Sequence, residues 1–399
     1  MRDISALCHV GQVDDGELSI IMLHTIHHAQ FTSRTRIDLP RSDAPDVSMH
    51  YTSAGALARV ETSLDNRAIE ALLEEIRLAL LTPTERRIHR ALVMVAVPVT
   101  GTWACDLFTL TAPPENAPRI PQLIQDYPLV LEFPYEGTQS FVINTHRATQ
   151  RMRQYELLLS LFIPTVQTTP RFTNQHWGMV MGGVIAATPE GFPKVEWVQE
   201  GYAIEGFEIT SNSLTPMSDP LMPLVSDAEF YGRRGIGADS IFDVPESLAS
   251  WIRHFASRTD ATKQSFLRSA FWLRHAGDVY RLSSSAALVA AVQAVEALLP
   301  PPQGVACPTC GLVGGPGPTA NFRSFLAQHA PTHDGDLVKA RTRLYQTRSK
   351  LTHGQDLLSS DSELGFGWSG PQEPFEQNDL DMATRVARIA AIRWLLLQT

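Results

Sequence analysis

The sequence predicts an α+β domain over residues 1–235 followed by an all-α helical bundle over residues 244–399. In the first part, short runs of aliphatic and β-branched residues are mixed with helical segments, whereas the second part contains mainly amphipathic helical patterns. Residues 210–223, rich in Pro, Ser and Thr, begin the passage between the two. A chain of 399 residues also exceeds the usual size of one domain.

In the first part we expect strands at residues 18–24, 91–99, 129–133 and 140–144, because these runs are short, apolar and bounded by polar, Gly or Pro residues. Helices are expected at residues 64–81 and 147–162, which end before Pro83 and Pro164. The topology of this domain does not follow from these patterns. A sensing or regulatory domain is a candidate role for it.

The second part is predicted to be helical almost throughout. Apolar residues at spacings of three and four indicate helices at residues 245–257, 263–280, 284–299, 322–329, 336–352 and 380–397. An irregular insert, residues 303–321, contains C-P-T-C-G and several glycines and prolines. Short loops between amphipathic helices favour a bundle of about five helices.

Composition and charge limit the classes of protein that fit. The apolar fraction of 44% and the charged fraction of 19% are those of a globular protein. The net charge of −9 divides unevenly, with −11 on residues 1–244 and +2 on residues 245–399, so a polyanion would meet the second part first. Four cysteines are too few for a disulfide scaffold, and no apolar run reaches the length of a membrane span. With no signal-like N-terminus, we expect a cytoplasmic protein without membrane contact.

A basic helix carries the most informative motif. Five cations, Lys339, Arg341, Arg343, Arg348 and Lys350, fall within twelve positions, and His353 and Gly354 follow. Glycine after the last turn is typical of a left-handed helix cap, which would leave His353 at the end of the helix. Arginine is a permanent cation, and histidine can carry a proton near neutral pH.

The spacing of Arg348 and His353 favours a site made by two chains. Five positions correspond to roughly 7.5 Å of helical rise, and the two side chains do not stack on one helical face. One copy is therefore a poor complete site. Two copies around a twofold axis could bring two arginines and two histidines to one phosphate, so we expect a homodimer.

Three stretches together resemble a known family: R-S-K-L-T-H-G at residues 348–354, S-S-S-A-A-L-V-A-A-V-Q-A-V-E-A-L-L at 283–299 and F-L-R-S-A-F-W-L-R-H-A at 266–276. Over residues 244–399 the chain resembles the HEPN superfamily, and within it the Apea-like HEPN proteins. The resemblance implies a metal-independent ribonuclease centre at a dimer interface, often in antiviral or abortive-infection systems. By position it implies Arg348 and His353 as catalytic residues.

The residue types agree with RNA cleavage. RNA carries its own nucleophile, the 2′-OH, so an enzyme needs a base, an acid and a cation for the developing charge, and no cofactor. Ser349 and Glu296 are candidate supporting residues, and Arg341, Arg343 and Lys350 are candidate RNA-binding residues. Many active members of the superfamily have Asn, Asp or His after the arginine, whereas this chain has Ser349. The alternative is therefore a non-catalytic HEPN module that binds RNA, a nucleotide or a protein partner.

Two further groups are candidate metal ligands. Cys307 and Cys310 have the spacing of one zinc knuckle, and His329 and His333 could complete a structural zinc site. The alternative is a pair of reduced thiols in a turn. His24, His27 and His28 form H-T-I-H-H, which lacks the glutamate of a metalloprotease helix and favours a packing or surface role over a metal-dependent hydrolase.

Overall fold

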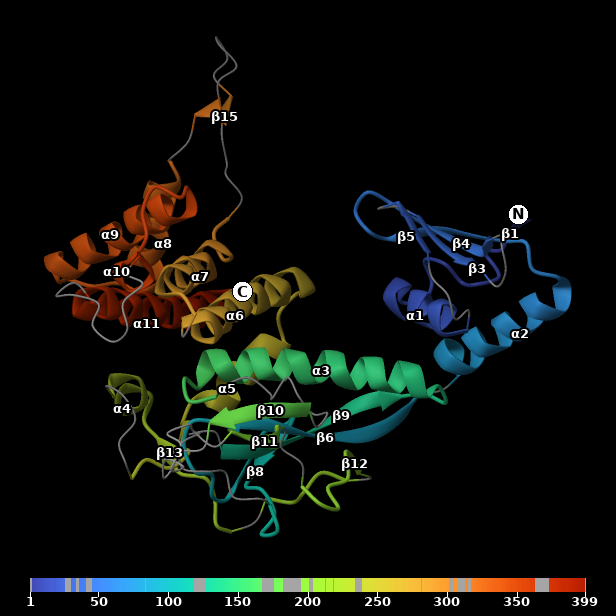
Figure 1. Cartoon of the computed structure of the whole chain (residues 1–399), viewed down its shortest axis with the longest axis horizontal. Helices are drawn as coiled ribbons and strands as arrows, with labels where there is room; N and C mark the ends of the chain where they lie inside the picture. The colour runs from blue at the N-terminus through green and yellow to red at the C-terminus, as the bar shows by residue number, and fades with distance from the viewer. Residues whose placement is uncertain are drawn as a thin grey trace. The chain divides into compact units, whose positions relative to one another are not determined.

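A computed structural model describes residues 2–398 except 26–29, 34–35, 41–44, 83, 118–126, 167–175, 182–194, 201–203, 212, 218, 234–238, 281, 301–304, 307–312, 315–316 and 363–372. Helices and strands are mixed, and the C-terminal region is helical. The chain divides into two compact units (Figure 1). Unit 1 comprises Met1–Arg90, Glu132–Arg153 and Glu208–Thr215, and unit 2 comprises Ala91–Leu131, Gln154–Phe207 and Pro216–Thr399. The predicted division into residues 1–235 and 244–399 does not follow these bounds, since residues 91–131 and 154–207 group with the C-terminal helices.

Unit 1 contains an antiparallel sheet and two helices. The sheet has the strand order β1-β5-β4-β3-β2, with β1 at Arg2–Asp3, β2 at Gln30–Ser33, β3 at Arg36–Pro40, β4 at Pro45–Tyr51 and β5 at Leu57–Thr62. Helix α1 spans Asp15–Thr25, and α2 spans Asn66–Ile76 and continues as a π-helical turn over Arg77–Leu81. The helix expected at residues 64–81 is confirmed.

The strand expected at residues 18–24 is wrong, because these residues belong to α1. A short apolar run has the same appearance in a buried strand and in a buried helix, so its periodicity does not separate them. The residue that distinguishes the helix from a strand is Asp14, which precedes the apolar run. The Oδ1 atom of Asp14 accepts a hydrogen bond from the backbone N of Glu17 at 2.8 Å, which satisfies a free donor at the start of α1.

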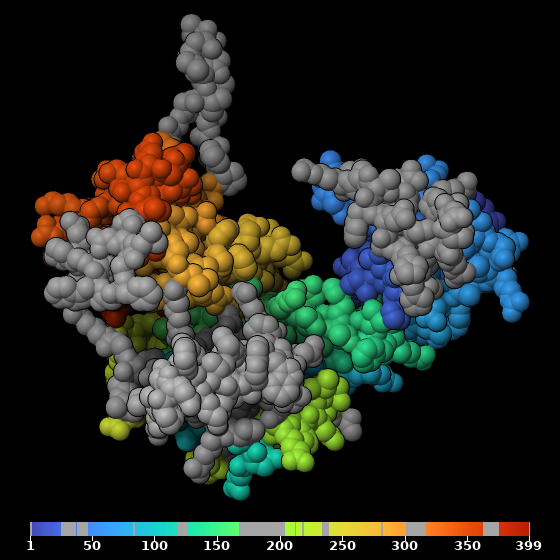
Figure 2. Space-filling model, in the orientation of Figure 1, coloured from blue at the N-terminus to red at the C-terminus, as the bar shows by residue number. Residues whose placement is uncertain are grey.

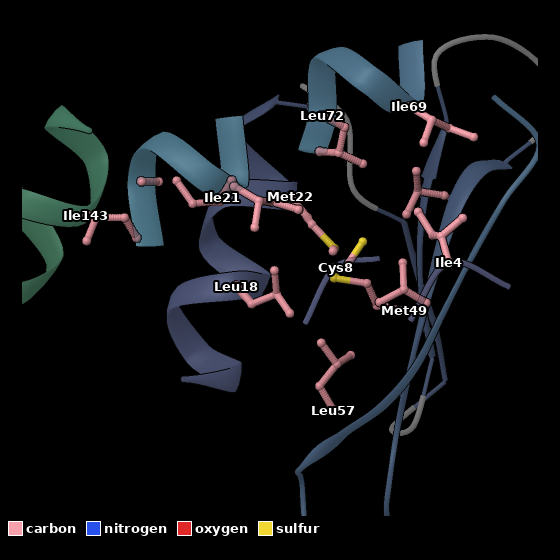
Figure 3. Close-up of a cluster of buried hydrophobic side chains, with 14 residues drawn as sticks. Ile4, Cys8, Leu18, Ile21, Met22, Met49, Leu57, Ile69, Leu72 and Ile143 are labelled. Carbon is pink, nitrogen blue, oxygen red and sulfur yellow. The ribbon is translucent and has the colours of Figure 1, made fainter. Parts of the chain in front are cut away.

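The core of unit 1 lies between α1, α2 and the sheet (Figure 3). Leu18 and Met22 from α1, together with Met49 and Val60 from the strands, are fully buried. Cys8 is among them, and burial raises the pKa of its thiol to about 12, with Asp3 adding to the shift. Cys8 is therefore a neutral packing residue at physiological pH.

A second sheet has the strand order β12-β6-β9-β8-β7, with β6 at Glu85–Val95, β7 at Thr102–Ala104, β8 at Thr109–Thr111, β9 at Tyr127–Gly137 and β12 at Thr210–Ser211. Most of the strand expected at residues 91–99 lies in β6, and that at 129–133 lies within β9. Helix α3 spans Phe141–Phe162, which confirms the helix expected at 147–162. The strand expected at 140–144 is wrong, because Ser140 Oγ accepts a hydrogen bond from the Ile143 backbone N at 3.4 Å and so begins α3.

The strands and helices that remain all belong to unit 2. The strands are β10 at His176–Met181, β11 at Val195–Glu200, β13 at Leu224–Val225, β14 at Val244–Pro245, β15 at Val305–Ala306 and β16 at Val313–Gly314. The helices are α4 at Asp227–Gly232, α5 at Leu248–Ala256, α6 at Asp260–Tyr280, α7 at Ser284–Glu296, α8 at Pro318–His329, α9 at Gly335–Thr352, α10 at Ser359–Ser362 and α11 at Glu373–Leu397. The helical segments expected after residue 244 are confirmed. None of the helices within the described ranges combines the length and apolarity needed to cross a membrane.

Helix α7 is the centre of the C-terminal helices, since α6, α9 and α11 all contact it. Its alanines Ala287, Ala290, Ala291 and Ala294 are each at most 2% exposed. Small side chains let the neighbouring helices approach α7 closely, and Leu344 from α9 and Leu380 from α11 fill the space around them. Figure 2 shows α6 to α9, coloured gold to red-orange, as one packed body.

The N-terminus of α7 is capped by Ser283 and by Asp361 from α10. The Asp361 carboxylate accepts hydrogen bonds from Ser283 Oγ at 2.8 Å and from the backbone N atoms of Ser284 and Ser285 at 3.0 and 2.7 Å. Burial alone would raise the pKa of Asp361, but these hydrogen bonds from Ser285, Ser283 and Ser284 outweigh it and lower the pKa. The carboxylate also lies at the positive end of the helix dipole.

Replacing Asp361 by Ala should lower the free energy of unfolding by about 1–2 kcal/mol, because α7 loses its cap. The carboxylate has a lower pKa in the folded than in the unfolded chain, so its contribution is complete above about pH 4 and is lost as the pH falls through the folded value. Urea unfolding at neutral and acidic pH measures this. Asp356→Ala, in the exposed loop before α10, is the matched control and should change stability by less than about 0.5 kcal/mol. Equal effects of the two substitutions would contradict the capping role.

Candidate active site

Arg348 lies on α9 at its contact with the end of α7. Its Nη2 donates a hydrogen bond to Oε2 of Glu296, the last residue of α7. Tyr345, one turn earlier on α9, donates its hydroxyl to the other carboxylate oxygen of Glu296 at 3.2 Å. The Arg348 guanidinium carbon lies 5.8 Å from the centre of the Tyr345 ring. Both carboxylate oxygens of Glu296 thus accept hydrogen bonds from side chains of α9.

The Arg348–Glu296 ion pair is largely covered. The exposed fractions of the two side chains are 19% and 22%. The Nε atom of Arg348 is buried and has no hydrogen-bond partner among the described residues. Burial, followed by the charge and hydrogen bond of Glu296, raises the pKa of Tyr345 and keeps its phenol protonated. Arg348 is therefore held in one place rather than extended into solvent.

His353 is the C-cap residue of α9 and is exposed. Gly354 follows with φ 65°, its N–H bonds to the Leu351 carbonyl at 3.1 Å, and the Gln355 N–H bonds to the Lys350 carbonyl at 2.9 Å. These two hydrogen bonds form a Schellman motif, which requires a left-handed residue where glycine stands. The predicted cap is confirmed, and it places the imidazole at the negative end of the helix dipole.

Within one chain the two candidate catalytic residues have different surroundings. Arg348 is covered by the α7–α9 contact, whereas His353 is exposed at the end of α9. Ser349, between them, is half-buried, and its carbonyl accepts the His353 N–H at 3.2 Å. The composite site made by two chains stays a prediction.

The candidate RNA-binding residues differ in their contacts. Arg341 donates Nη1 to the Ala330 carbonyl, and burial lowers the pKa of its guanidinium. Arg343 pairs with Asp379 of α11 at 2.8 Å, and this bond raises the pKa of Arg343. Lys350 is exposed. Some of the cations of α9 are thus already bonded to other groups of the same chain.

The candidate metal ligands are only partly described. Cys307, Cys310, His27 and His28 lie outside the described residues. His329 is 5% exposed and packs against Phe325, with 4.4 Å between ring centres. Burial, with a smaller effect of Arg393, lowers the pKa of His329, so the ring is neutral, and its buried Nδ1 has no partner among the described residues.

The other histidines differ from His329. His333 is exposed in the loop that precedes α9, and His24 lies in α1. In the ranges that the structure describes, no group of three or more His, Cys, Asp or Glu residues is arranged to hold a metal ion. The zinc site remains a prediction, because both cysteines fall outside those ranges.

Glu296 was predicted as a supporting residue, and in the structure it accepts a hydrogen bond from Arg348. Tyr345 and Asp379 were not predicted from the sequence. Tyr345 precedes Arg348 by three positions and so shares its helical face, a spacing that could have identified it. The partner of Arg343 is on another helix, and nothing in the linear sequence marks that pair.

Comparisons with protein-family models, with curated proteins and with solved structures found no match.

Glu296→Ala should lower the free energy of unfolding by about 1–3 kcal/mol, because it leaves a covered guanidinium and the Tyr345 hydroxyl without their acceptor. A double-mutant cycle with Arg348→Ala, measured by urea unfolding, should give a coupling energy of at least about 0.5 kcal/mol. The exposed pair Lys339 and Asp336 is the matched control and should couple more weakly. A coupling energy no larger than that of the control would contradict a structural ion pair.

Proposed function

We propose that the helices after residue 244 form a HEPN-like bundle and that the chain is a metal-independent endoribonuclease. Its site would combine Arg348 and His353 from two copies of the chain. The observation that supports this most is that Arg348 is fixed by Glu296 while His353, five positions later, is exposed at the end of the same helix. The arrangement supplies a held cation and an accessible proton carrier, and two copies of it would supply the base, the acid and the cation that RNA cleavage uses.

The proposed reaction uses the 2′-OH of the substrate. A His353 imidazole removes the 2′-OH proton, and the 2′ oxygen forms a bond to phosphorus while the bond from phosphorus to the 5′ oxygen breaks. A second imidazole, protonated, gives its proton to the departing 5′ oxygen. The products are a 2′,3′-cyclic phosphate, or the 3′-phosphate after hydrolysis, and a 5′-hydroxyl. The Arg348 guanidinium stabilises the charge that develops on the phosphate oxygens.

Glu296 would act as a positioning residue in this site. It contacts Arg348 and Tyr345, and it lies at the C-terminal end of the most buried helix of the bundle. A guanidinium on a long side chain loses rotational freedom when it is ordered, and Glu296 supplies that order before RNA binds. The reduced exposure of Arg348 also suits a group that contacts one phosphate rather than many.

A non-catalytic binding module is the second candidate. The ion pair between Arg348 and Glu296 is also what a structural bridge between α7 and α9 requires, and Ser349 follows the arginine where many active relatives of the resembled superfamily have Asn, Asp or His. In this case His353→Ala would leave RNA affinity unchanged. Lys350→Ala would weaken affinity and reduce its dependence on salt by about one counterion.

The purified full-length chain should cleave single-stranded RNA in the presence of a chelator. Arg348→Ala and His353→Ala should each lower the rate by at least about 100-fold, because general acid–base and charge stabilisation are lost. A substrate with 2′-deoxy nucleotides should not be cleaved. His275→Ala, on α6 of the same bundle, is the matched histidine control and should keep the activity. Cleavage of the deoxy substrate would overturn the mechanism.

A mixing experiment tests whether the site needs two chains. Unchanged chain that is unfolded and refolded with an equal amount of His353→Ala should show about half of the activity it has when refolded alone, because roughly half of the dimers then carry a single His353 and the proposed step uses two. The mass of the native protein by light scattering should be that of a dimer. If the mixture keeps the full activity of the unchanged chain that it contains, each chain acts alone and the composite site is wrong.

A further inference from the structure

A cavity of about 380 Å³ in unit 2 is lined by residues of α4, α11 and the segments before β14 and after α3. Arg348, Glu296 and His353 are not among its lining residues, so it is a separate feature from the candidate active site. Its volume falls within the usual range for small-molecule sites, about 300–1,000 Å³. Three arginines and one aspartate contribute to its wall.

Arg388 of α11 is one of the residues that line the cavity. Its Nη1 donates to the Ser160 carbonyl at 2.7 Å and to the Leu161 carbonyl, and the Tyr231 hydroxyl donates to the Phe162 carbonyl at 2.5 Å. These groups satisfy carbonyls in the last turn of α3, where the helix dipole favours a cation. Both hydrogen bonds use one nitrogen, so among the described residues the Nε and Nη2 atoms of Arg388 have no protein acceptor.

The charge on Arg388 is not balanced by a carboxylate in the described part of the chain. Burial lowers the pKa of its guanidinium to about 10, and Tyr231 acts in the opposite direction. Even at that value the group is a cation at neutral pH. A desolvated cation without a counter-ion is stabilised when an anion binds beside it.

Arg385 precedes Arg388 by three positions on α11 and lines the same cavity. It is exposed, and its only hydrogen bond to a described residue goes from Nη2 to the Arg233 carbonyl at 3.4 Å. The aspartate in the wall, Asp243, is paired with the Arg233 side chain, which also contacts Glu229 at 3.1 Å. The three arginines and one aspartate of the lining sum to a charge of +2, part of which Glu229 offsets from outside the lining, and Arg385 and Arg388 are the two arginines without a carboxylate partner in the described part of the chain.

The remaining wall combines apolar side chains with the polar residues Thr165, Ser240 and Thr384. Phe230, Val97 and Pro164 line it, together with Ile241 and Ile389, which are 45% and 40% exposed. Exposed aliphatic groups beside a cationic centre favour a ligand that has both an anionic group and an apolar part. Free inorganic phosphate would leave these side chains in contact with water.

We propose that this cavity binds a small organic phosphate monoester, with the phosphate on Arg385 and Arg388 and the apolar part against Ile241 and Phe230. A phosphate monoester carries a charge of about −1.5 to −2 at pH 7, which matches the two unbalanced guanidinium groups. Guanidinium groups also bind phosphate oxygens through paired, charge-assisted hydrogen bonds. The proposal goes beyond the nuclease function and does not depend on it.

Calorimetric titration of the full-length chain in a buffer free of phosphate and sulfate tests this, with phenyl phosphate as the probe. Phenyl phosphate should bind saturably at one site per chain. Inorganic phosphate and benzyl alcohol should each bind at least about tenfold more weakly, since each lacks one half of the ligand. His353→Ala should bind the probe as the unchanged chain does, which separates this result from any failure of the nuclease assay.

Arg385→Gln should weaken phenyl phosphate binding at least about tenfold. Because Arg385 is exposed, this variant should fold normally, and its unfolding temperature without ligand verifies that. Arg393→Gln, on the same helix but outside the cavity lining, is the matched control and should leave binding unchanged. Ile241→Ser should weaken the binding of phenyl phosphate and leave that of inorganic phosphate unchanged.

Three results would overturn the proposal. They are the absence of saturable binding of phenyl phosphate, equal affinities for phenyl phosphate and inorganic phosphate, and equal effects of Arg385→Gln and Arg393→Gln. The second result would mean a non-selective anion contact, and the third would place the probe elsewhere on the chain.

Discussion

The ion pair between Arg348 and Glu296 is the interaction on which the candidate active site depends. It joins α9 to the end of α7, and Tyr345 uses the second oxygen of the same carboxylate. A covered guanidinium without this acceptor would be costly to keep in the fold, so the pair fixes the side chain where the two helices meet. The position of Arg348 therefore follows from how α7 packs. That packing depends on the buried alanines of α7 and on the Asp361 cap at its N-terminus.

The chain uses its arginines in two different ways. Arg341, Arg343 and Arg348 stand close together in sequence, yet each has a partner inside the fold: a carbonyl, Asp379 and Glu296. Cations near the protein interior need acceptors because desolvation is otherwise not offset. A count of basic residues along a helix therefore overstates the positive surface that RNA would meet. Arg341 and Arg348 are the covered cations of this segment, whereas Arg343, Lys350 and His353 are exposed.

Arg388 shows the same physical requirement with a different outcome. Its acceptors are backbone carbonyls at the end of α3, which are dipoles rather than full charges. They satisfy hydrogen bonds but leave the net charge in place, and Arg385 adds a second charge next to it. A cavity whose wall combines two such cations with exposed aliphatic side chains has the composition expected of a ligand site.

The sequence by itself determined the helices after residue 244, the cap at Gly354 and the mixed character of the first part, because these depend on local spacing, Pro and Gly. It did not separate strand from helix at residues 18–24 and 140–144, where short apolar runs fit both. Only the tertiary structure decided which cations are paired with a carboxylate and which only with carbonyls, since Asp379, Glu296 and the α3 carbonyls are distant in sequence from Arg343, Arg348 and Arg388. It also decided where the arginines of α11 meet α4 to line a cavity. Such pairs depend on how helices pack, and periodicity along one helix carries no information about what lies across the interface.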